Sequence, residues 1–572
     1  MRSTAIRSGK ITNATQQRAL SSPGDSSPDS SRHSSAGAGW HCGQPGSFVN
    51  LIPPVPETKD AGSTKRSNQL RDRMYWFRLS VLWGSRNDAL SRLSDPVPEL
   101  RRRWINGRGT DELLVDLSDR DSFSFLLMGD TGEGDYSQYA VVPPLCRVAD
   151  ASSPSFVIIC SDILYPVGNI NEYGDKFYQP YRTLPAPIYT IPGNHDWYDD
   201  LTAFMANFGH PETLPPPPEP DPRRPQRRGL ARTWDAVRSK LRDALWRRPT
   251  PAIDPAAIHA ARSLRGQPAQ QQPAPQPGPY YVIDTKYLRL VCIDTGIRGH
   301  IDEDQGRWLI EVSSDPRPKI LITGKPLLVD GTVHPCSIAN APDGFESVLS
   351  VVHSAGFNYV AVIGGDVHNY QHYPATVVAN ETTRTIHHIV SGGGGAFMHA
   401  THLVPIIDPA EMFGVTEQTY KAYPLRRDSL AAYSHVVQGM LDRLLPRRLR
   451  PNVTLDDTQA AEVLHRKLGT PLDRPAQPAP PGSSPTRASI SAHKLRLSGL
   501  ILKVGGRRFH NWFSPFCDWD DPPFFKHFLR IDVRVDGATI TCHAATGCVE
   551  HEAQPPIEDV TELTWDIAPT VA

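Results

Sequence analysis

Short apolar runs recur along the middle of the chain, and each of them ends in Gly, Asp, Asn or Pro. From residue 123 onward there are seven such runs: FSFLLMGD, FVIICSD, IYTIPGNHD, LRLVCIDTG, KILITGKP, YVAVIGGDVH and IHHIVSGGGG. Runs this short that are apolar throughout are typical of strands buried on both faces, and several are separated by enough chain for a helix. The pattern predicts an α/β core over residues 121–404.

The C-terminal part shows a different pattern. The string FFKHFLRIDVRVDGATITCHAATG alternates apolar and polar residues on either side of Asp536-Gly537, a dipeptide that favours tight hairpin turns. We therefore expect residues 523–566 to form strands that rejoin the main sheet.

Two stretches interrupt this regular pattern. Residues 211–279 are rich in proline and arginine, and residues 405–522 combine a periodic helix over 428–445 with a Pro-rich loop at 470–485 and an aromatic stretch from Trp512 to Trp519. Both are predicted to be insertions into the core.

The N-terminal region has little apolar periodicity. Residues 1–70 are rich in Ser, Pro and Gly, cannot bury enough apolar surface to offset the entropy of ordering, and are predicted to be disordered. Residues 71–120 carry an amphipathic Trp- and Leu-bearing stretch and are predicted to be a lead-in that packs on the edge of the core.

The amino-acid composition argues against some classes of function. The 572 residues include 60 Lys and Arg against 61 Asp and Glu, and this net charge of −1 argues against a dedicated nucleic-acid-binding protein. No apolar run reaches the 18 residues of a membrane span, and the N-terminus lacks the apolar stretch of a signal peptide, so a cytoplasmic location is expected. The eight cysteines form no C-x-x-C pair, which favours free thiols.

One segment departs from the balanced charge. Residues 223–248 carry ten Lys and Arg against two Asp, and Trp234, Val237, Leu241 and Leu245 share one face of a possible helix. Such a segment could contact an acidic surface, whether a membrane, a protein or RNA. The alternative is a solvated or lid-like insertion with no partner.

Chemistry-bearing side chains follow the predicted strands. In α/β sheets ligands bind beyond the carboxyl ends of the strands, so these residues are expected to converge. They are Asp130, Asp162, Asn194, His195, Asp294, Lys325, Asp366 and His368. Oxygen donors mixed with histidine suit iron, manganese or zinc, the metals that generate hydroxide near neutral pH.

The order of these residues resembles that of a known family. The motifs are Asp130-Thr131-Gly132, Ser161-Asp162-Ile163-Leu164-Tyr165, Gly193-Asn194-His195-Asp196 and Gly365-Asp366-Val367-His368. They are similar to the ordered motifs of the calcineurin-like metallophosphoesterases, and within these to the branch containing purple acid phosphatases. Longer strings such as SDILYPVGNINEYGDKFYQPY look closer to little-described bacterial and plant relatives. The resemblance implies a four-layer αββα sandwich of two mixed β-sheets.

The resemblance also implies a ligand set for one or two metal ions, either divalent or of mixed valence (Fe, Mn or Zn). The first would be held by Asp130, Asp162, Tyr165 and His368. The second would take the bridging Asp162, Asn194 and two histidines, but this chain has Lys325 and Asp366 at the two histidine positions. A lysine ammonium has no lone pair to coordinate a metal. His334 and His353 are spare candidates for the second ion, and His372 could face the site.

The activity implied by the resemblance is hydrolysis of phosphate esters. A metal-bound hydroxide would attack phosphorus in line, while His195, held by Asp196, assists the leaving oxygen, and Lys325 supplies positive charge beside Asp366. Two alternatives remain open at this point: a phosphoesterase fold that has lost catalysis and binds ligands or partners, and an interaction protein that acts through its basic insertion. The substrate and the oligomeric state are not indicated.

Overall fold

A computed structural model gives the arrangement of most of the chain. It describes residues 79–209, 237–238, 240–241, 244–246, 254–265, 275–379, 382–470, 490–503, 525–547 and 557–565. The predicted disordered tail, most of the basic segment 223–248, nearly all of the Pro-rich loop at 470–485 and the stretch from Trp512 to Trp519 lie outside the described residues.

The first large sheet has eight strands and is mostly parallel in its centre. Its order is β1-β5-β6-β7-β10-β12-β11-β13. The strands are β1 (Leu114–Leu117), β5 (Tyr281–Thr285), β6 (Arg289–Ile293), β7 (Lys319–Thr323), β10 (Tyr359–Gly364), β12 (Thr382–Ser391), β11 (Tyr370–Ala379) and β13 (Lys421–Tyr423). Strands β6, β7, β10 and β12 run parallel, whereas β11 pairs antiparallel with β12 and β13.

The second large sheet has six strands, in the order β16-β15-β14-β2-β3-β4. They are β16 (Ile557–Thr564), β15 (Gly537–Ala544), β14 (His527–Arg534), β2 (Phe123–Met128), β3 (Phe156–Cys160) and β4 (Ile188–Ile191). Strands β2, β3 and β4 are parallel, and β14 joins β2 antiparallel. The predicted hairpin at Asp536-Gly537 is confirmed, because β14 and β15 pair from Arg534 with Gly537 onward.

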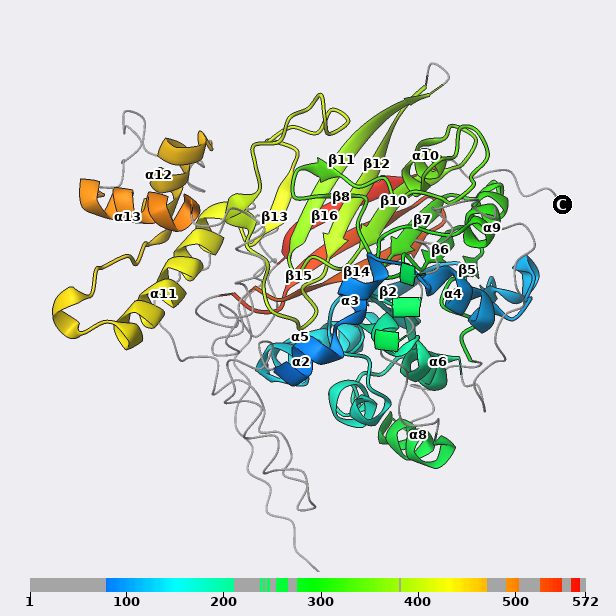
Figure 1. Ribbon diagram of the computed structural model, residues 1–572. Coiled ribbons are helices and arrows are strands. Elements are labelled where there is room, and N and C mark those ends of the chain that lie inside the picture. The colour runs from blue at the N-terminus through cyan, green and yellow to red at the C-terminus, as the bar shows by residue number, and fades with distance from the viewer. Residues whose placement is uncertain are drawn as a thin grey trace, which may run out of the picture.

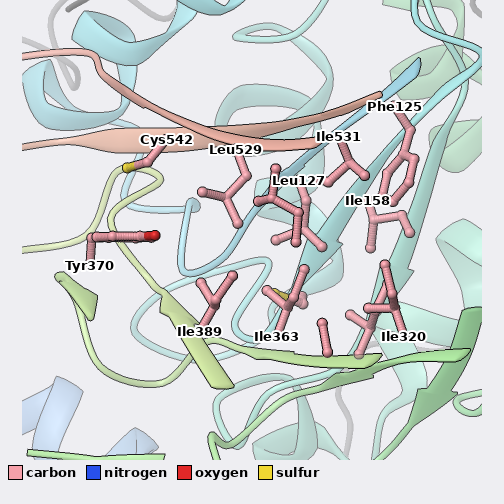
Figure 2. Close-up of a cluster of buried hydrophobic side chains, with 14 of the residues drawn as sticks. Phe125, Leu127, Ile158, Ile320, Ile363, Tyr370, Ile389, Leu529, Ile531 and Cys542 are labelled. Atoms are coloured by element: carbon pink, nitrogen blue, oxygen red, sulfur yellow. The ribbon is translucent and has the colours of Figure 1, made fainter. Parts of the chain in front are cut away.

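The two sheets pack face to face, and their inner faces form the central core (Figure 1). Figure 2 shows Leu127, Leu529 and Ile531 of the six-stranded sheet opposite Ile363 and Ile389 of the eight-stranded sheet. These side chains are almost completely buried. Removing this much apolar surface from water is the dominant favourable term in folding.

Helices cover both outer faces. The outer side of the six-stranded sheet packs against α5 (Tyr136–Ser152), α6 (Thr202–Phe208) and parts of α3 (Asn87–Ser91) and α4 (Val97–Ile105). The outer side of the eight-stranded sheet packs against α9 (Glu303–Ser313) and α10 (Val348–His353). The fold is therefore the predicted four-layer αββα sandwich of two mixed sheets.

Smaller elements complete the described part. They are α2 (Leu79–Gly84), α8 (Pro255–Arg262), the short ladder of β8 (Leu328–Val329) with β9 (Thr332–Val333), and the single turns Thr110–Glu112, Ile170–Glu172, Gly174–Tyr178, Asp196–Asp199, Ser263–Arg265, Thr401–Leu403 and Arg447–Leu449.

Residues after 404 supply both a strand and a helical group. β13 extends the eight-stranded sheet, while α11 (Arg426–Leu444), α12 (Asp457–Leu468) and α13 (Ala492–Lys503) share a small apolar cluster of their own. This group lies to the left of the sheets in Figure 1. The predicted lead-in likewise does more than pack on an edge, because its β1 pairs in parallel with β5. Among the described residues, no helix is both long enough and apolar enough to cross a bilayer.

Candidate metal centre

The loops that follow five strands meet at one end of the sandwich. Asp130, Asp162 and Asn194 follow β2, β3 and β4 of one sheet, and Lys325 and Asp366 follow β7 and β10 of the other. A hydrogen bond joins the two groups, because the backbone N–H of Asp366 donates to Asp130 Oδ2 at 2.8 Å. The carboxyl ends of both sheets thus contribute to one site, as expected for α/β folds.

The hydroxyl of Tyr165 marks the centre of this site. Its oxygen lies 3.0 Å from Asp130 Oδ1, 3.0 Å from Asp162 Oδ2 and 3.0 Å from His368 Nε2. All four side chains are at most 5 % exposed. Two carboxylates, an imidazole and a phenol therefore gather around one point inside the protein.

The charges of these groups favour a cation at that point. Burial, followed by the neighbouring Asp162 and Asp366 carboxylates, raises the pKa of Asp130 well above its usual value. Burial also raises the pKa of Asp162, although nearby His195 opposes the change, and burial with Asp130 and Asp162 raises the pKa of Tyr165. A positive ion would relieve both the burial cost and the repulsion of these acidic groups.

The contacts and the pKa of His368 suit a neutral metal ligand. Its Nδ1 lies 2.6 Å from the carbonyl oxygen of Phe397, so Nδ1 carries the proton and Nε2 presents its lone pair to Tyr165. Burial, followed by the neighbouring His399, lowers the pKa of His368 well below its usual value. His399 stacks on this ring with centroids 4.3 Å apart, and its Nδ1 accepts the backbone N–H of His368 at 3.2 Å. Such outer partners fix the orientation of a metal-binding histidine.

The backbone at the site is unusual for residues other than glycine. Asp130, Asp162 and Asp366 have φ angles of 58°, 31° and 65°. This left-handed region costs most side chains free energy, about 1–3 kcal/mol per residue at strained positions, and Asp is among the few that tolerate it. The three aspartates therefore occupy positions where glycine would be under less backbone strain.

Glycines allow the loops to approach these carboxylates closely. A Cβ on Gly193 would lie 2.1 Å from Asp162 Oδ1, and one on Gly392 would lie 2.6 Å from Asp130 Oδ2. Glycines 392–395 also let neighbouring segments approach closely, because a Cβ on any of them would lie within 2.8 Å of a neighbouring atom.

A second group of polar side chains lies beside the first. Lys325 Nζ is 3.2 Å from Asn194 Oδ1 and contacts Asp366 Oδ1. Burial alone would lower the pKa of Lys325, but Asp366, followed by Asp162 and Asp130, outweighs it and raises the pKa, so the amine is an ammonium. The amide of Asn194 is also held from its other side, since Nδ2 donates to the hydroxyl of Tyr198 at 3.0 Å.

His195 and Asp196 have different surroundings. The His195 backbone N–H donates to Asp162 Oδ1 at 2.8 Å, and its ring Nδ1 lies 2.6 Å from the carbonyl oxygen of Pro166. Asp196 Oδ2 instead accepts the backbone N–H groups of Ile163 and Gly193, each at 3.0 Å. The geometry therefore differs from the expected arrangement in which Asp196 holds His195: the carbonyl of Pro166 contacts the ring, and Asp196 ties together the loops after β3 and β4.

Some predicted residues lie elsewhere. Asp294 accepts from Arg101 and from the indole N–H of Trp197, a structural role in the outer core. His334 contacts the Thr332 hydroxyl, His353 contacts His388, and His372 contacts Asp559. None of these contacts involves the residues that surround Tyr165.

Sequence reasoning missed three supporting residues. Tyr198 and His399 orient Asn194 and His368, and the Lys176 ammonium donates to the Tyr165 carbonyl at 2.5 Å. Tyr198 could have been found from its position four residues after Asn194 on the same turn. Lys176 and His399 carried no signal that distinguishes them from solvated side chains.

The residues present fit a metal ion. Within the described ranges, no group of three or more His, Cys, Asp or Glu side chains has the spacing of a metal site. The fourth donor here is the Tyr165 phenol, and a set of oxygens with one imidazole suits iron, manganese or zinc. The crowding of acidic groups around Tyr165 is the observation that favours such an ion.

Comparison with known proteins agrees with the motif order. Residues 123–235 match the family model of calcineurin-like phosphoesterases, which confirms the predicted resemblance. No curated protein matches the chain significantly.

Three solved structures are among those that match the chain. A purple acid phosphatase from yellow lupin (Lupinus luteus) seeds is 10 % identical with a TM-score of 0.31, over 78 % of this chain and 55 % of that one. The chain thus spans about half the length of that phosphatase. GAP50, the anchor in the inner membrane complex of Plasmodium, is 9 % identical with a TM-score of 0.35, over 79 % and 91 % of the two chains. PhoD is 10 % identical with a TM-score of 0.28, over 77 % and 68 %.

Proposed function

Because residues 123–235 carry a calcineurin-like phosphoesterase domain, we propose that this protein is a metal-dependent hydrolase of phosphate esters. The observation that carries the proposal is the convergence of Asp130, Asp162 and His368 on the hydroxyl of Tyr165, each at 3.0 Å. A metal ion bound by these side chains would polarise a phosphoryl oxygen and make water a better nucleophile.

Different side chains would bind the metal ion and transfer the proton. Asp130, Asp162, Tyr165 and His368 would hold the ion, and Asp162 also accepts the backbone N–H of His195. The Pro166 carbonyl contacts Nδ1 of His195, so a proton passed to the leaving oxygen would come from Nε2. A positioned general acid contributes about 10²–10⁴-fold to such a step.

Lys325, oriented by Asn194 and Asp366, is the group that would attract the anionic substrate. A phosphoryl group brings negative charge that grows on the leaving oxygen during hydrolysis, and a fixed cation in a partly dry site stabilises such charge. The Lys325 ammonium is held by Asn194 and Asp366 at the edge of the site, where about a quarter of its side chain remains exposed. It is therefore accessible to a substrate.

The test measures metal content and ester turnover on the same protein. Purified protein is analysed for metals by mass spectrometry and assayed with aryl phosphate monoesters and diesters, before and after removal of metal by a chelator. The proposal expects turnover that is lost with the metal and restored by adding back iron, manganese or zinc. Metal bound tightly without turnover of any ester would instead favour a phosphoesterase fold that now acts as a binding module.

A further inference from the structure

Two oxygen-bearing side chains, Asn194 and Asp366, stand next to the Tyr165 cluster and contact a cation that belongs to the protein itself, the ammonium of Lys325. Lys325 Nζ lies 3.2 Å from Asn194 Oδ1 and contacts Asp366 Oδ1. Asp366 is joined through its backbone N–H to Asp130, and Asp162 reaches the same region through the His195 N–H. An amide oxygen and carboxylates are hard donors that suit a cation, and here the ammonium takes them.

The lysine is held in place from several sides. Thr323 Oγ1 accepts the backbone N–H of Lys325 at 3.3 Å and donates to its carbonyl at 3.0 Å, which fixes the turn after β7. The aliphatic part of the side chain passes over Gly299, where a Cβ would lie 3.1 Å from Lys325 Cδ. An ordered stem of this kind is typical of a lysine with a defined position rather than a freely moving surface charge.

A metal ion and this ammonium compete for the same oxygens. Metal bonds to carboxylate or amide oxygen are about 2.0–2.2 Å long for zinc, so an ion on Asn194 and Asp366 would need the space that Nζ occupies. An ammonium offers no lone pair and repels a neighbouring dication. The two arrangements are therefore mutually exclusive.

We propose that the ammonium of Lys325 replaces a second metal ion, so that the protein binds one metal ion per chain and uses Lys325 as its second cation toward the phosphoryl group. This inference rests on the proposed function, because it assumes a metal at Tyr165. It makes a different prediction, however, since it concerns how many ions bind rather than whether the protein hydrolyses esters.

Metal stoichiometry tests the inference directly. The full chain is dialysed to equilibrium against Mn²⁺ and, separately, Zn²⁺, and bound metal is measured by mass spectrometry against protein concentration. We expect about one ion per chain in the unmodified protein and a rise toward two in Lys325→Ala, which frees Asn194 and Asp366. Lys325→Arg keeps the charge and should remain near one.

A matched control and a second neutral variant complete the design. Lys286 also pairs with an aspartate, Asp121, but at an exposed position away from the site, so Lys286→Ala should not change the stoichiometry. Lys325→Gln removes the charge while keeping a hydrogen-bonding side chain. It replaces the alanine variant in the stoichiometry measurement if that variant does not fold.

The outcomes separate the two proposals. Two tightly bound ions in the unmodified protein, or one ion in both neutral variants, would overturn the replacement by Lys325 while leaving the hydrolase proposal intact. No bound metal in the unmodified protein, together with no turnover, would overturn the hydrolase proposal and the inference with it.

Discussion

At the scale of single residues, Asp162 and His195 lie side by side yet make different contacts. Asp162 Oδ2 is 3.0 Å from the Tyr165 hydroxyl in the middle of the candidate metal centre, and its other oxygen accepts the His195 N–H. The His195 ring instead contacts the Pro166 carbonyl. Substitution at the two positions should therefore affect binding and turnover differently.

We expect Asp162→Ala to lose metal and activity together, because it removes a donor from the cluster. His195→Ala should keep the metal and slow turnover by about 10²–10⁴-fold, the usual contribution of a general acid. Metal analysis and kcat measurements on the same preparations check both expectations. Equal loss of metal in the two variants would contradict the roles assigned here.

Individual residues also show the limit of reading a site from sequence. Asp294 and Asp366 both follow an apolar strand, and the apolar pattern alone does not distinguish them. Asp366 reaches Lys325, whereas Asp294 pairs with Arg101, almost two hundred residues earlier in the chain. Only the packing of distant elements decides which aspartate lies at the candidate site.

At the scale of elements, α4 is tied to the core by a buried ion pair. Arg101 is 2 % exposed, and its guanidinium donates to Asp294 at 2.8 Å and to Asp302 at 2.5 Å. Its neighbour Arg102 pairs with Asp304 at 2.9 Å, but both of those side chains are about 30 % exposed. The two arginines thus offer a matched comparison of buried and exposed pairing.

Arg101→Ala should lower the free energy of unfolding by about 3–5 kcal/mol, because it leaves two carboxylates without their buried partner. Arg102→Ala should cost less than about 1 kcal/mol, since an exposed pair is screened by water. Denaturant unfolding of both variants measures the difference. Similar losses at the two positions would show that α4 is held by something other than this ion pair.

The loop after β12 packs closely against a neighbouring side chain at a glycine. A Cβ on Gly393 would lie 2.1 Å from Nδ1 of His527, a buried side chain at the start of β14. Gly393→Ala should therefore destabilise the fold by about 1–3 kcal/mol through overpacking. Gly439 in α11 has no neighbour within 4 Å, so Gly439→Ala should be neutral or stabilise by up to about 1 kcal/mol. Thermal unfolding of the pair tests this.

The strands found from sequence share one property. All seven apolar runs became strands of the two sheets, β2, β3, β4, β6, β7, β10 and β12, because burial on both faces leaves a continuous apolar signal. No apolar run predicted β1, β5, β11 or β13, whereas β16 lies within residues 523–566, which were expected to form strands. β16 is mostly exposed or half-buried, and β11 reads YQHYPATVVA, so neither shows the same signal.

At the scale of the whole molecule, buried neutral histidines make stability depend on pH. Burial, with a contribution from Lys526, lowers the pKa of His527 to about 3, and burial lowers the pKa of His353 and His387 to about 4. An unfolded chain protonates histidine near pH 6.5. As the pH falls below that value the unfolded state gains protons that the folded state cannot accept, so stability is lost.

We expect the free energy of unfolding to fall between about pH 6.5 and pH 3, with His527 contributing at most about 5 kcal/mol at 1.36 kcal/mol per pKa unit. His527→Phe keeps a ring at this position and removes the titration, so its stability should fall less over the same range. Urea unfolding at several pH values compares the two proteins. Parallel curves for both would show that His527 does not titrate as described.

The pairing of β2 with β14 has a consequence for biosynthesis. About 400 residues separate these two neighbouring strands. At roughly 5–20 residues per second, a ribosome needs about 20–80 seconds to make the chain between them. During that time the edge of β2 lies open to pairing with other chains, a known route to aggregation. The yield of folded protein therefore depends on how well that edge is protected until β14 leaves the ribosome.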